Sequence, residues 1–373
     1  MSNILITFEV KDNTTDNNLL AMTTVLSKMN TRYRVVQASS VVVSDIEWCE
    51  VYIANRPNSV YSLEILRAAK ASGRYIVIAL DDDIVNLPES HPDHWKRTYT
   101  LASLELGDAL LSPNQLLLDD YCGEFNLYPI LSIAFVKETD IKPLHPLLQK
   151  IRIVYPAGKD HIIYFNKYIK PFFDRFVSSY ANTVDVTFIG IEPNVKQSDN
   201  IHFIKGMSYK DYLDFMRTHD FDIGIAPLDD DRFCARKYFA KYIEYSKYGI
   251  LGLYSNVKPY TYAVKDGVNG LLVPGKNGQW EKILNEIVIE PEKIWELTLN
   301  AQQDLKYRYS LENAVKMLRK GCIELEAYNC DGPVVFRKSF VGRAKYVLRD
   351  ISVKVIYHLR NDGISYAVTF LRR

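Results

Sequence analysis

Short runs of β-branched and other apolar residues alternate along this chain with segments whose apolar residues recur at helical spacing. This alternation is typical of parallel strands joined by crossover helices, and it disfavours a β-sandwich or a helical bundle. In the first part of the chain the apolar runs predict strands at 4–8, 34–37, 51–54, 75–80 and 109–112. After the third of these, Leu63, Leu66 and Ala69 share one helical face and Gly73 follows them, which predicts a βαβ unit.

A second series of the same kind begins after the proline-containing stretch IKPLHPLLQK, with the strand-like run IRIVYP. Further strands are predicted at 184–189, 202–204, 223–226, 250–254 and 271–273, and helices at 163–180, 209–218, 236–247, 279–289 and 311–325. The second half therefore repeats the architecture of the first. We predict an α/β protein with two Rossmann-like, doubly wound domains, 1–147 and 148–328, and a C-terminal helical segment, 329–373.

The length of 373 residues is more than twice that of a typical domain of about 150 residues, which supports the two-domain prediction. Open α/β sheets bind ligands at the carboxyl ends of their strands, so we expect the two domains to face each other across a shared cleft. No apolar run approaches the roughly 18 residues of a membrane-spanning helix, and the N-terminus lacks the features of a signal peptide. Five scattered cysteines without paired spacing add to the prediction of a cytoplasmic location.

The segment 222–274 contains the residues with the clearest chemical use. A predicted strand ends in a polar loop, DDDRFCARK, which leads into the next predicted helix. The first backbone N–H groups of that helix, with Arg236 and Lys237 beside them, would form an anion site suited to a diphosphate. Lys237 and Lys241 are one turn apart, and Glu244 lies on nearly the same face, where its carboxylate could accept hydrogen bonds from ribose hydroxyls. The alternative is a solvated basic helix face with ordinary ion pairs.

This segment resembles the donor-binding region of retaining glycosyltransferases of the GT-B fold, in particular those of family four (glycosyltransferase group 1). The family pattern is a strand ending in proline, a helix with K-x-x-E-Y, a glycine, a strand and a D-G-x-x-G-x-L-V turn. Its counterparts here are Pro227, Lys241-Tyr242-Ile243-Glu244-Tyr245, Gly249, and Asp266-Gly267-Val268-Asn269-Gly270-Leu271-Leu272-Val273. The resemblance implies the GT-B fold and a nucleotide sugar, linked to UDP, GDP or dTDP, as the donor substrate.

The resemblance also assigns roles to single residues, with one departure. In the family the second glutamate of an E-x7-E pattern binds the donor ribose, which corresponds to Glu244, but the first glutamate is replaced here by Arg236. Either contacts to the donor sugar then come from Asp229, Asp230 or Asp231, or the donor hexose is held differently. We count Asp231 among the catalytic candidates. Enzymes of this family retain the anomeric configuration and need no cofactor, so the nearby cations would stabilise the departing diphosphate.

Two further stretches resemble parts of the family. IRIVYPAGKDH is similar to the opening motif of its second domain, where a glycine after a strand lets the backbone approach the donor phosphates. Gly158 and His161 are therefore donor-site candidates, with Lys159 as a weaker one, and a plain turn is the alternative. IVIALDDDIVNLPESHPDHW resembles an aspartate-rich, proline-containing loop of the first domain.

On that loop, Asp83 and His91 are candidates for a catalytic role beside the acceptor. Three consecutive aspartates with His91 and His94 nearby could also bind a divalent cation. We predict no metal, because the resemblance implies that cations and helix ends compensate the phosphate charge. A capped turn beside Pro88 and Pro92 is the remaining alternative for the two histidines.

The C-terminal segment differs in charge from the rest of the chain. Residues 331–373 carry nine Lys or Arg and three Asp, a net charge of +6, whereas the whole chain is at +1. A helix over 342–359 would group Ala344, Val347, Leu348, Ile351, Val355 and Leu359 on one side, flanked by Arg343, Lys345, Arg349, Lys354 and Arg360. We expect such a basic amphipathic helix to bind an anionic membrane surface, through 337–360. The alternative is packing on the protein or on a second subunit, and the acidic body of the chain disfavours nucleic acid.

Taken together, these patterns predict an enzyme, a hexosyltransferase-like glycosyltransferase. It would transfer a sugar from a nucleotide sugar to a glycan or lipid-linked saccharide in surface polysaccharide synthesis, in the cytoplasm and peripherally on the inner face of the cell membrane. Because Arg236 occupies the place of a glutamate, a non-catalytic glycosyltransferase-like partner subunit is the alternative. A sugar phosphorylase or a nucleotide-sugar epimerase of the same fold would use the lysine-rich loop equally well.

Overall fold

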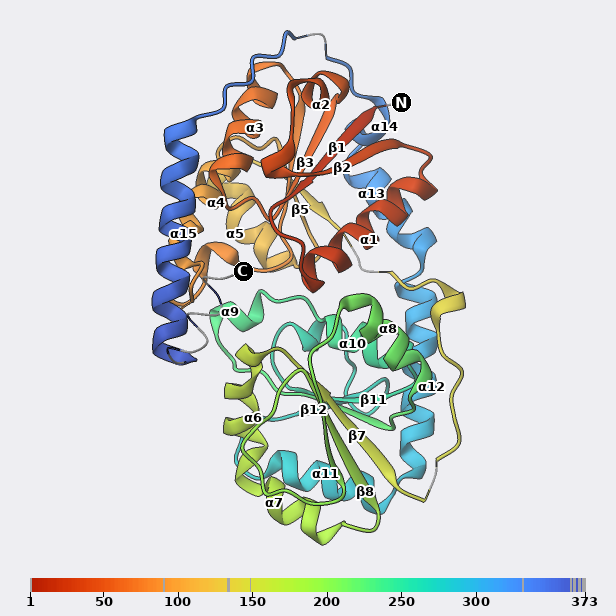
Figure 1. Ribbon diagram of the computed structural model, residues 1–373. Helices are drawn as coiled ribbons and strands as arrows, with labels where there is room; N and C mark the ends of the chain where they lie inside the picture. The colour runs from red at the N-terminus through yellow and green to blue at the C-terminus, as the bar shows by residue number, and fades with distance from the viewer. Residues whose placement is uncertain are drawn as a thin grey trace. The chain divides into compact units, whose positions relative to one another are not determined.

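A computed structural model describes residues 2–89, 91–132, 135–147, 149–330, 332–362, 364, 367 and 370 (Figure 1). The chain forms two compact units, one of Met1–Ser132 with Val315–Arg373 and one of Ile133–Ala314. The division falls inside the helix α13 (Leu311–Gly321). The domain boundaries predicted from the sequence, at 147/148 and 328/329, concern functional domains and stay predictions.

The first unit contains a six-stranded parallel sheet in the order β2-β1-β3-β4-β5-β6. Its strands are β1 (Asn3–Phe8), β2 (Arg32–Gln37), β3 (Val51–Asn55), β4 (Tyr75–Ala79), β5 (Ala109–Ser112) and β6 (Tyr128–Leu131). The predicted strands are confirmed, with small shifts at their ends. β3 and β5 are buried along their whole length, as expected when helices cover both faces of a parallel sheet. β6 has no counterpart in the prediction, because its exposed Tyr128 and Pro129 interrupt the apolar run.

Helices connect these strands and complete the first unit. They are α1 (Asn13–Lys28), α2 (Val43–Trp48), α3 (Val60–Ala71), α4 (Arg97–Leu104), α5 (Gln115–Phe125), α14 (Glu324–Ala327) and α15 (Phe340–Asn361), with the 3-10 helices η1 (Ala38–Ser40), η2 (Ile84–Asn86) and η3 (His94–Lys96). The predicted βαβ unit is confirmed at α3. The side chain of Ser59 caps α3 by accepting a hydrogen bond from Ser62 N at 3.2 Å, and Gly73 follows it at φ +72°.

The second unit contains another six-stranded parallel sheet, in the order β12-β11-β10-β7-β8-β9. Its strands are β7 (Ile151–Pro156), β8 (Val184–Ile189), β9 (Ile201–Ile204), β10 (Ile223–Ala226), β11 (Leu251–Ser255) and β12 (Leu271–Val273). Read from β9, this is the strand order of a doubly wound dinucleotide-binding sheet. Alternate residues of β7 enter two apolar clusters, Ile153 and Tyr155 one and Val154 the other, so both faces of the sheet are covered. The predicted repetition of the architecture is confirmed.

The helices of the second unit correct two predictions. They are α6 (Ile162–Tyr168), α7 (Lys170–Ser179), α8 (Tyr209–Thr218), α9 (Arg232–Ala235), α10 (Ala240–Lys247), α11 (Gln279–Ile289) and α12 (Glu292–Arg308), with η4 (Glu138–Asp140), η5 (Lys159–His161) and η6 (Tyr260–Tyr262). The helix predicted over 163–180 is broken at Ile169, because Pro171 can only occupy the first turn of α7. The helix predicted over 236–247 begins only at Ala240. The helices at 209–218 and 279–289 are confirmed.

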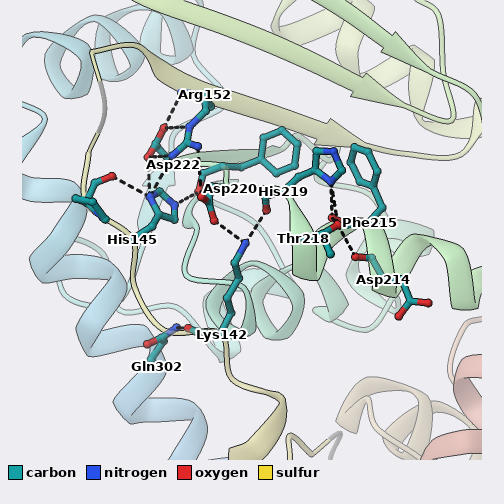
Figure 2. A network of polar contacts seen from close by, with 12 residues as sticks. Lys142, His145, Arg152, Asp214, Phe215, Thr218, His219, Asp220, Asp222 and Gln302 are labelled. Atoms are coloured by element: carbon teal, nitrogen blue, oxygen red, sulfur yellow. Dashed lines mark hydrogen bonds and ion pairs between the residues drawn. The ribbon is translucent and has the colours of Figure 1, made fainter.

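A polar network holds the segment that leads into β7 at the amino ends of β7 and β10 (Figure 2). Asp222 has no exposed surface and accepts hydrogen bonds from Arg152 N, Nε and Nη2 at 2.7, 3.1 and 3.3 Å. His145 lies beside this pair, with its Nδ1 at 3.1 Å from Arg152 Nη2. Lys142 Nζ pairs with Asp220 at 2.7 Å. The network therefore fixes how the chain enters the second sheet.

The predicted C-terminal helix is confirmed as α15. It packs on α3, and Figure 1 shows it in blue alongside α3 and α4 of its own unit. Within the described part of the chain, no helix is long and apolar enough to cross a membrane.

Candidate functional site

The carboxyl edge of the second sheet brings several predicted site residues together. β7 and β10 are neighbours there, and their connections lead to opposite ends of the sheet, which is the point where open α/β sheets bind ligands. The loop after β7 contains Gly158 and leads into η5. The loop after β10 contains Pro227 and leads through Asp231 into α9. Motifs that lie some 70 positions apart in the chain therefore share one edge of the sheet.

The backbones of two loops come close at this edge. Gly190 follows β8 with φ +83°, and a Cβ atom there would lie 2.7 Å from Ala157 O in the loop after β7. Gly190 is therefore required both by its conformation and by the close approach. Gly158 has a φ of −77°, and an added Cβ atom would meet only the side chain of Asp160. Sequence reasoning missed Gly190, although a glycine directly after a predicted strand was the available signal.

Glu244 of α10 is held by two side chains of its own unit. The Tyr212 hydroxyl, from α8, donates a hydrogen bond to Glu244 Oε1. Lys241 Nζ lies 3.2 Å from Oε1 and 3.1 Å from Oε2, which confirms that the two residues share a helix face. A carboxylate that accepts a phenol hydroxyl can equally accept a sugar hydroxyl. Sequence reasoning missed Tyr212, because only the packing of α8 beside α10 brings it to Glu244.

Burial controls the charges of this pair. It raises the pKa of Glu244 and lowers the pKa of Lys241. Either charge alone would be costly here, and the ion pair offsets that cost. Burial also raises the pKa of Tyr209 to about 12, with a further contribution from Glu244. An anion that approached Lys241 would compete with Glu244 for its positive charge.

His161 links the loop after β7 to the lysines beyond β10. The pKa of His161 is lowered to about 4, chiefly by burial and further by the positive charges of Lys237 and Lys241, against the opposing charge of Asp160. Charges act on one another strongly only over distances below about 10 Å, so these side chains form one cluster. The His161 ring is therefore neutral at pH 7, near Lys237 and the paired Lys241.

This lowered pKa predicts a pH-dependent stability. Between pH 6.5 and about 4 the unfolded chain binds a proton at His161 more readily than the folded chain. The stability that the neutral ring contributes is complete above pH 6.5 and is lost as the pH falls toward 4. We expect the difference in free energy of unfolding between wild type and His161→Gln to change by up to about 3 kcal/mol over this range, measured by urea unfolding.

The control is His202→Gln, because His202 is exposed on β9 of the same unit. Its unfolding free energy should follow that of the wild type at every pH. If the free energies of unfolding of wild type and His161→Gln changed in parallel with pH, His161 would not be the group that causes the pH dependence.

Arg236 and Lys237 lie elsewhere than predicted. Asp231 caps α9 by accepting a hydrogen bond from Cys234 N at 2.7 Å, and this short helix ends with Arg236 as its C-cap. The two basic residues therefore lie in the connection between α9 and α10, shortly before the N-cap Phe239 of α10. The predicted helix start at Arg236 is wrong, and the anion site beside these residues stays a prediction. Lys237 is also not one helical turn from Lys241, but the electrostatic effect of both on His161 keeps them in one cluster.

Asp229 is engaged by two side chains near the end of α6. Tyr168 Oη donates to its Oδ1 at 2.6 Å, and Lys167 Nζ does so at 2.7 Å. Burial raises the pKa of Asp229, but these two hydrogen bonds outweigh that effect and lower it below its ordinary value. Asp229 is therefore a stable anion, and Asp231 is an exposed helix cap. The roles predicted for them toward a sugar stay predictions.

In the first unit, Asp83 and His91 occupy the loop that follows β4. Asp83 has no exposed surface and accepts hydrogen bonds from Asn86 N at 3.3 Å and from Tyr121 Oη at 2.5 Å. His91 is half-buried, and its Nδ1 accepts a hydrogen bond from Asp93 N at 3.1 Å. These contacts organise the loop. A catalytic role stays a prediction for both residues, and for Asp83 it would require the loop to open.

The other members of the aspartate-rich loop form a separate ion cluster. Arg56 follows β3 with φ +50° and bonds to Asp81 Oδ2 at 2.9 Å and Asp82 Oδ2 at 2.8 Å. His94 Nδ1 lies 2.7 Å from Leu87 O. Among the residues that the structure describes, no three His, Cys, Asp or Glu side chains are grouped to hold a metal ion.

Sequence reasoning also missed Glu9, at the carboxyl end of β1. Its Oε1 accepts hydrogen bonds from the Ser62 hydroxyl and from Asn58 N, the latter at 3.2 Å. Burial raises its pKa against the opposing effect of these hydrogen bonds. No motif marks this glutamate, and only its place directly after the first predicted strand could have drawn attention to it.

Comparisons with known proteins give the fold a precedent. No protein-family model matches the chain, and no curated protein matches it in sequence. Among solved structures, HepE from Anabaena in complex with UDP and glucose is 12% identical, with a TM-score of 0.60 over 86% of this chain and 99% of that one. Sucrose-phosphate synthase from Thermosynechococcus elongatus is 10% identical, with a TM-score of 0.62 over 87% and 99%. An alpha-glucosyltransferase in complex with UDP is 11% identical, with a TM-score of 0.57 over 85% and 98%.

Proposed function

The chain has the GT-B fold, and from this premise we propose that it is a glycosyltransferase that uses a nucleotide sugar. The observation that carries the proposal is the group of Lys241, Glu244 and Tyr212, in which Glu244 contacts the other two, and the charge of Lys241 also acts on His161 in the loop after β7. UDP is present in the HepE and alpha-glucosyltransferase structures, which supports a nucleoside diphosphate as the ligand of this group.

Each of these residues has a part in this proposal. Glu244 accepts hydrogen bonds from the ribose hydroxyls, as it does from Tyr212 in the free protein. Lys241 and Lys237 face the diphosphate, and the neutral ring of His161 adds a polar contact without repelling further cations. Gly190 allows the backbone to pass close to the phosphates.

Glycosyl transfer breaks the anomeric C–O bond through an oxocarbenium-like transition state, and negative charge then grows on the departing diphosphate. Preorganised cations at that place lower the barrier. Lys237 and Lys241 supply them in our proposal, and we name no carboxylate nucleophile.

Finer features of the proposal follow the resemblance to family four. The reaction retains the anomeric configuration and proceeds without a metal ion. The acceptor is a glycan or lipid-linked saccharide of a surface polysaccharide, and Asp83 and His91 are the residues of the first unit that we place beside it.

Ligand-induced stabilisation tests the proposed donor site. We expect one of UDP, GDP or dTDP, or its sugar, to raise the unfolding temperature of the wild type, because a ligand at 100 times its dissociation constant adds about 2.7 kcal/mol to the stability. Glu244→Gln should lose most of this shift, because the amide cannot replace the carboxylate toward two ribose hydroxyls. The measurement is thermal unfolding across the nucleotide panel.

The matched control is Glu281→Gln on α11, where the glutamate pairs with Arg175 on the surface of the same unit. It should keep the full shift. A shift that survives in Glu244→Gln would remove the ribose role from this residue, and no shift with any nucleotide would contradict the donor site.

A non-catalytic, glycosyltransferase-like partner subunit is the second candidate. The replacement of the first family glutamate by Arg236 favours it, since this side chain turns back to Arg232 O at 3.1 Å. Donor hydrolysis without acceptor separates the two, because a binding-only protein releases no sugar. Product analysis likewise separates transfer from phosphorolysis and from epimerisation.

A further inference from the structure

The two faces of α15 differ in what they contact. The inner face packs on the first unit: the ring of Tyr346 is buried and lies 5.3 Å from Trp95 and 5.4 Å from Tyr99, measured between centroids. Arg343 pairs with Glu64 at 2.6 Å. These contacts hold the helix in a fixed rotation about its axis, so its outer face is also defined.

The outer face of α15 is apolar and exposed. Val341, Leu348 and Leu359 lie at its centre, because they are separated by seven and eleven positions, which is close to two and three helical turns. Leu348 exposes 66% of its surface, and Phe340, at the start of the helix, 86%. The sequence pattern grouped Leu348 and Leu359 with Ala344, Val347, Ile351 and Val355 on one side, and in the structure all of these except Val355 are exposed.

Positive charge accompanies this apolar face. Lys345 and Arg360 are exposed along one border of it, as is Arg349, whose guanidinium also lies over the Trp95 ring at 4.7 Å from its centroid. Exposed Arg337 and Lys338 precede the helix. The only acidic residue of α15 is Asp350, which is turned inward to Lys96 at 2.9 Å and is bonded to Lys354 at 2.8 Å. The outer face therefore combines exposed apolar side chains with exposed cations.

We propose that this outer face of α15 binds the surface of a membrane that contains anionic lipids. An apolar stripe that enters the acyl boundary, bordered by cations at the level of the headgroups, is the arrangement by which a helix lies in a lipid interface. A second copy of the chain fits the face less well, because two-fold pairing would bring cations of the same sign together.

The position of α15 links a membrane surface to the loop that carries Asp83 and His91. Trp95 and Lys96 of that loop are the residues on which Tyr346 and Asp350 pack. If the proposed function holds, the surface that binds α15 is also the place of a lipid-linked acceptor. Membrane binding itself does not depend on that function.

Vesicle co-sedimentation of the full chain tests the proposal. We expect the wild type to sediment with phosphatidylcholine vesicles that contain phosphatidylglycerol, and not with phosphatidylcholine alone. Lys345→Glu with Arg360→Glu should weaken this binding about 25-fold or more, since each cation contributes about fivefold near an anionic surface. Leu348→Ser with Leu359→Ser should weaken it more than about tenfold through the lost apolar burial.

The matched control is Lys316→Glu with Lys320→Glu, on the exposed side of α13 in the same unit. It changes the net charge equally, and it should leave the binding unchanged. Thermal unfolding verifies that each variant is folded.

Three results would overturn the proposal. They are absence of binding by the wild type, equal binding to both vesicle types, and a wild-type dimer in light scattering that only the Leu348→Ser, Leu359→Ser variant loses. The vesicle assay contains no sugar nucleotide. Its result therefore does not depend on whether the donor-site test succeeds or fails.

Discussion

Replacing Asp222 with asparagine should lower the free energy of unfolding by about 3 kcal/mol or more. The carboxylate is fully buried and accepts three hydrogen bonds from Arg152, one from its backbone N–H and two from its guanidinium group (Figure 2). The amide has one oxygen to accept them and turns an NH₂ group toward the remaining donors, so the Arg152 charge loses its nearer partner and keeps only Asp220, at 3.7 Å. Because Arg152 keeps 19% of its side chain exposed, water recovers part of the loss and the effect stays near the lower end of the range for buried pairs.

The control for this substitution is Asp185→Asn. Asp185 lies opposite Arg152 in the ladder between β7 and β8 and pairs with Lys150 at 2.9 Å, with both partners partly exposed. The Asp185→Asn variant should lose less than about 1 kcal/mol of the free energy of unfolding. The free energies are measured by urea unfolding. The dependence of the free energy on urea concentration is compared between the variants, because equal slopes show that only the stability has changed. Equal effects of the two substitutions would show that the network does not anchor β7 to β10.

The strands could be predicted from the sequence where both faces of the sheet are covered. Every position of β3 (Val51–Asn55) and of β11 (Leu251–Ser255) is buried, and only the last residue of each, Asn55 or Ser255, is polar. At the edge of the first sheet this signal disappears, since β6 exposes Tyr128 and Pro129. The other edge strands, β2, β9 and β12, were predicted, so the missed strand is the one whose exposed proline interrupts the apolar run.

The break between α9 and α10 could not be predicted from local sequence. Residues 236–239 contain neither glycine nor proline, and helical spacing continues through them. The helix is interrupted because Asp231 caps a separate short helix and because Phe239 is buried in a cluster of residues from distant segments. Tertiary contacts of this kind override local propensity.

The candidate site was predicted where it depends on spacing within one helix. Lys241 and Glu244, three positions apart, share a helix face as expected, and they form the ion pair that the alternative interpretation of this helix describes. Tyr212 was missed because it reaches Glu244 from another helix, 32 positions away in the chain. Asp83 shows the opposite case, since a conspicuous run of aspartates proved to place it inside the fold, where it caps η2. Residue type and spacing indicate chemistry, but burial decides which of the marked groups a ligand can reach.

Replacing Lys241 with methionine should lower kcat/KM for the donor by about 10²–10³ if the proposed function holds. The methionine keeps most of the length and apolar contact of the lysine but removes the charge that would face the departing diphosphate. Donor hydrolysis and transfer with UDP-glucose as the probe give the rate. Lys282→Met, on the exposed surface of α11, is the control and should keep the wild-type rate.

Nucleotide affinity then separates the parts of Lys241 and Glu244. Lys241→Met should weaken binding of a nucleoside diphosphate more than that of the monophosphate, because the lost charge acts on the added phosphate. Glu244→Gln should weaken both to the same degree, because the ribose is common to them. In Lys241→Met, burial still raises the pKa of Glu244 against the opposing charge of Lys247, so the affinity should recover partly as the pH rises and Glu244 ionises. Equal losses for both nucleotides in Lys241→Met would mean that the lysine only holds Glu244 in place and does not face the phosphates.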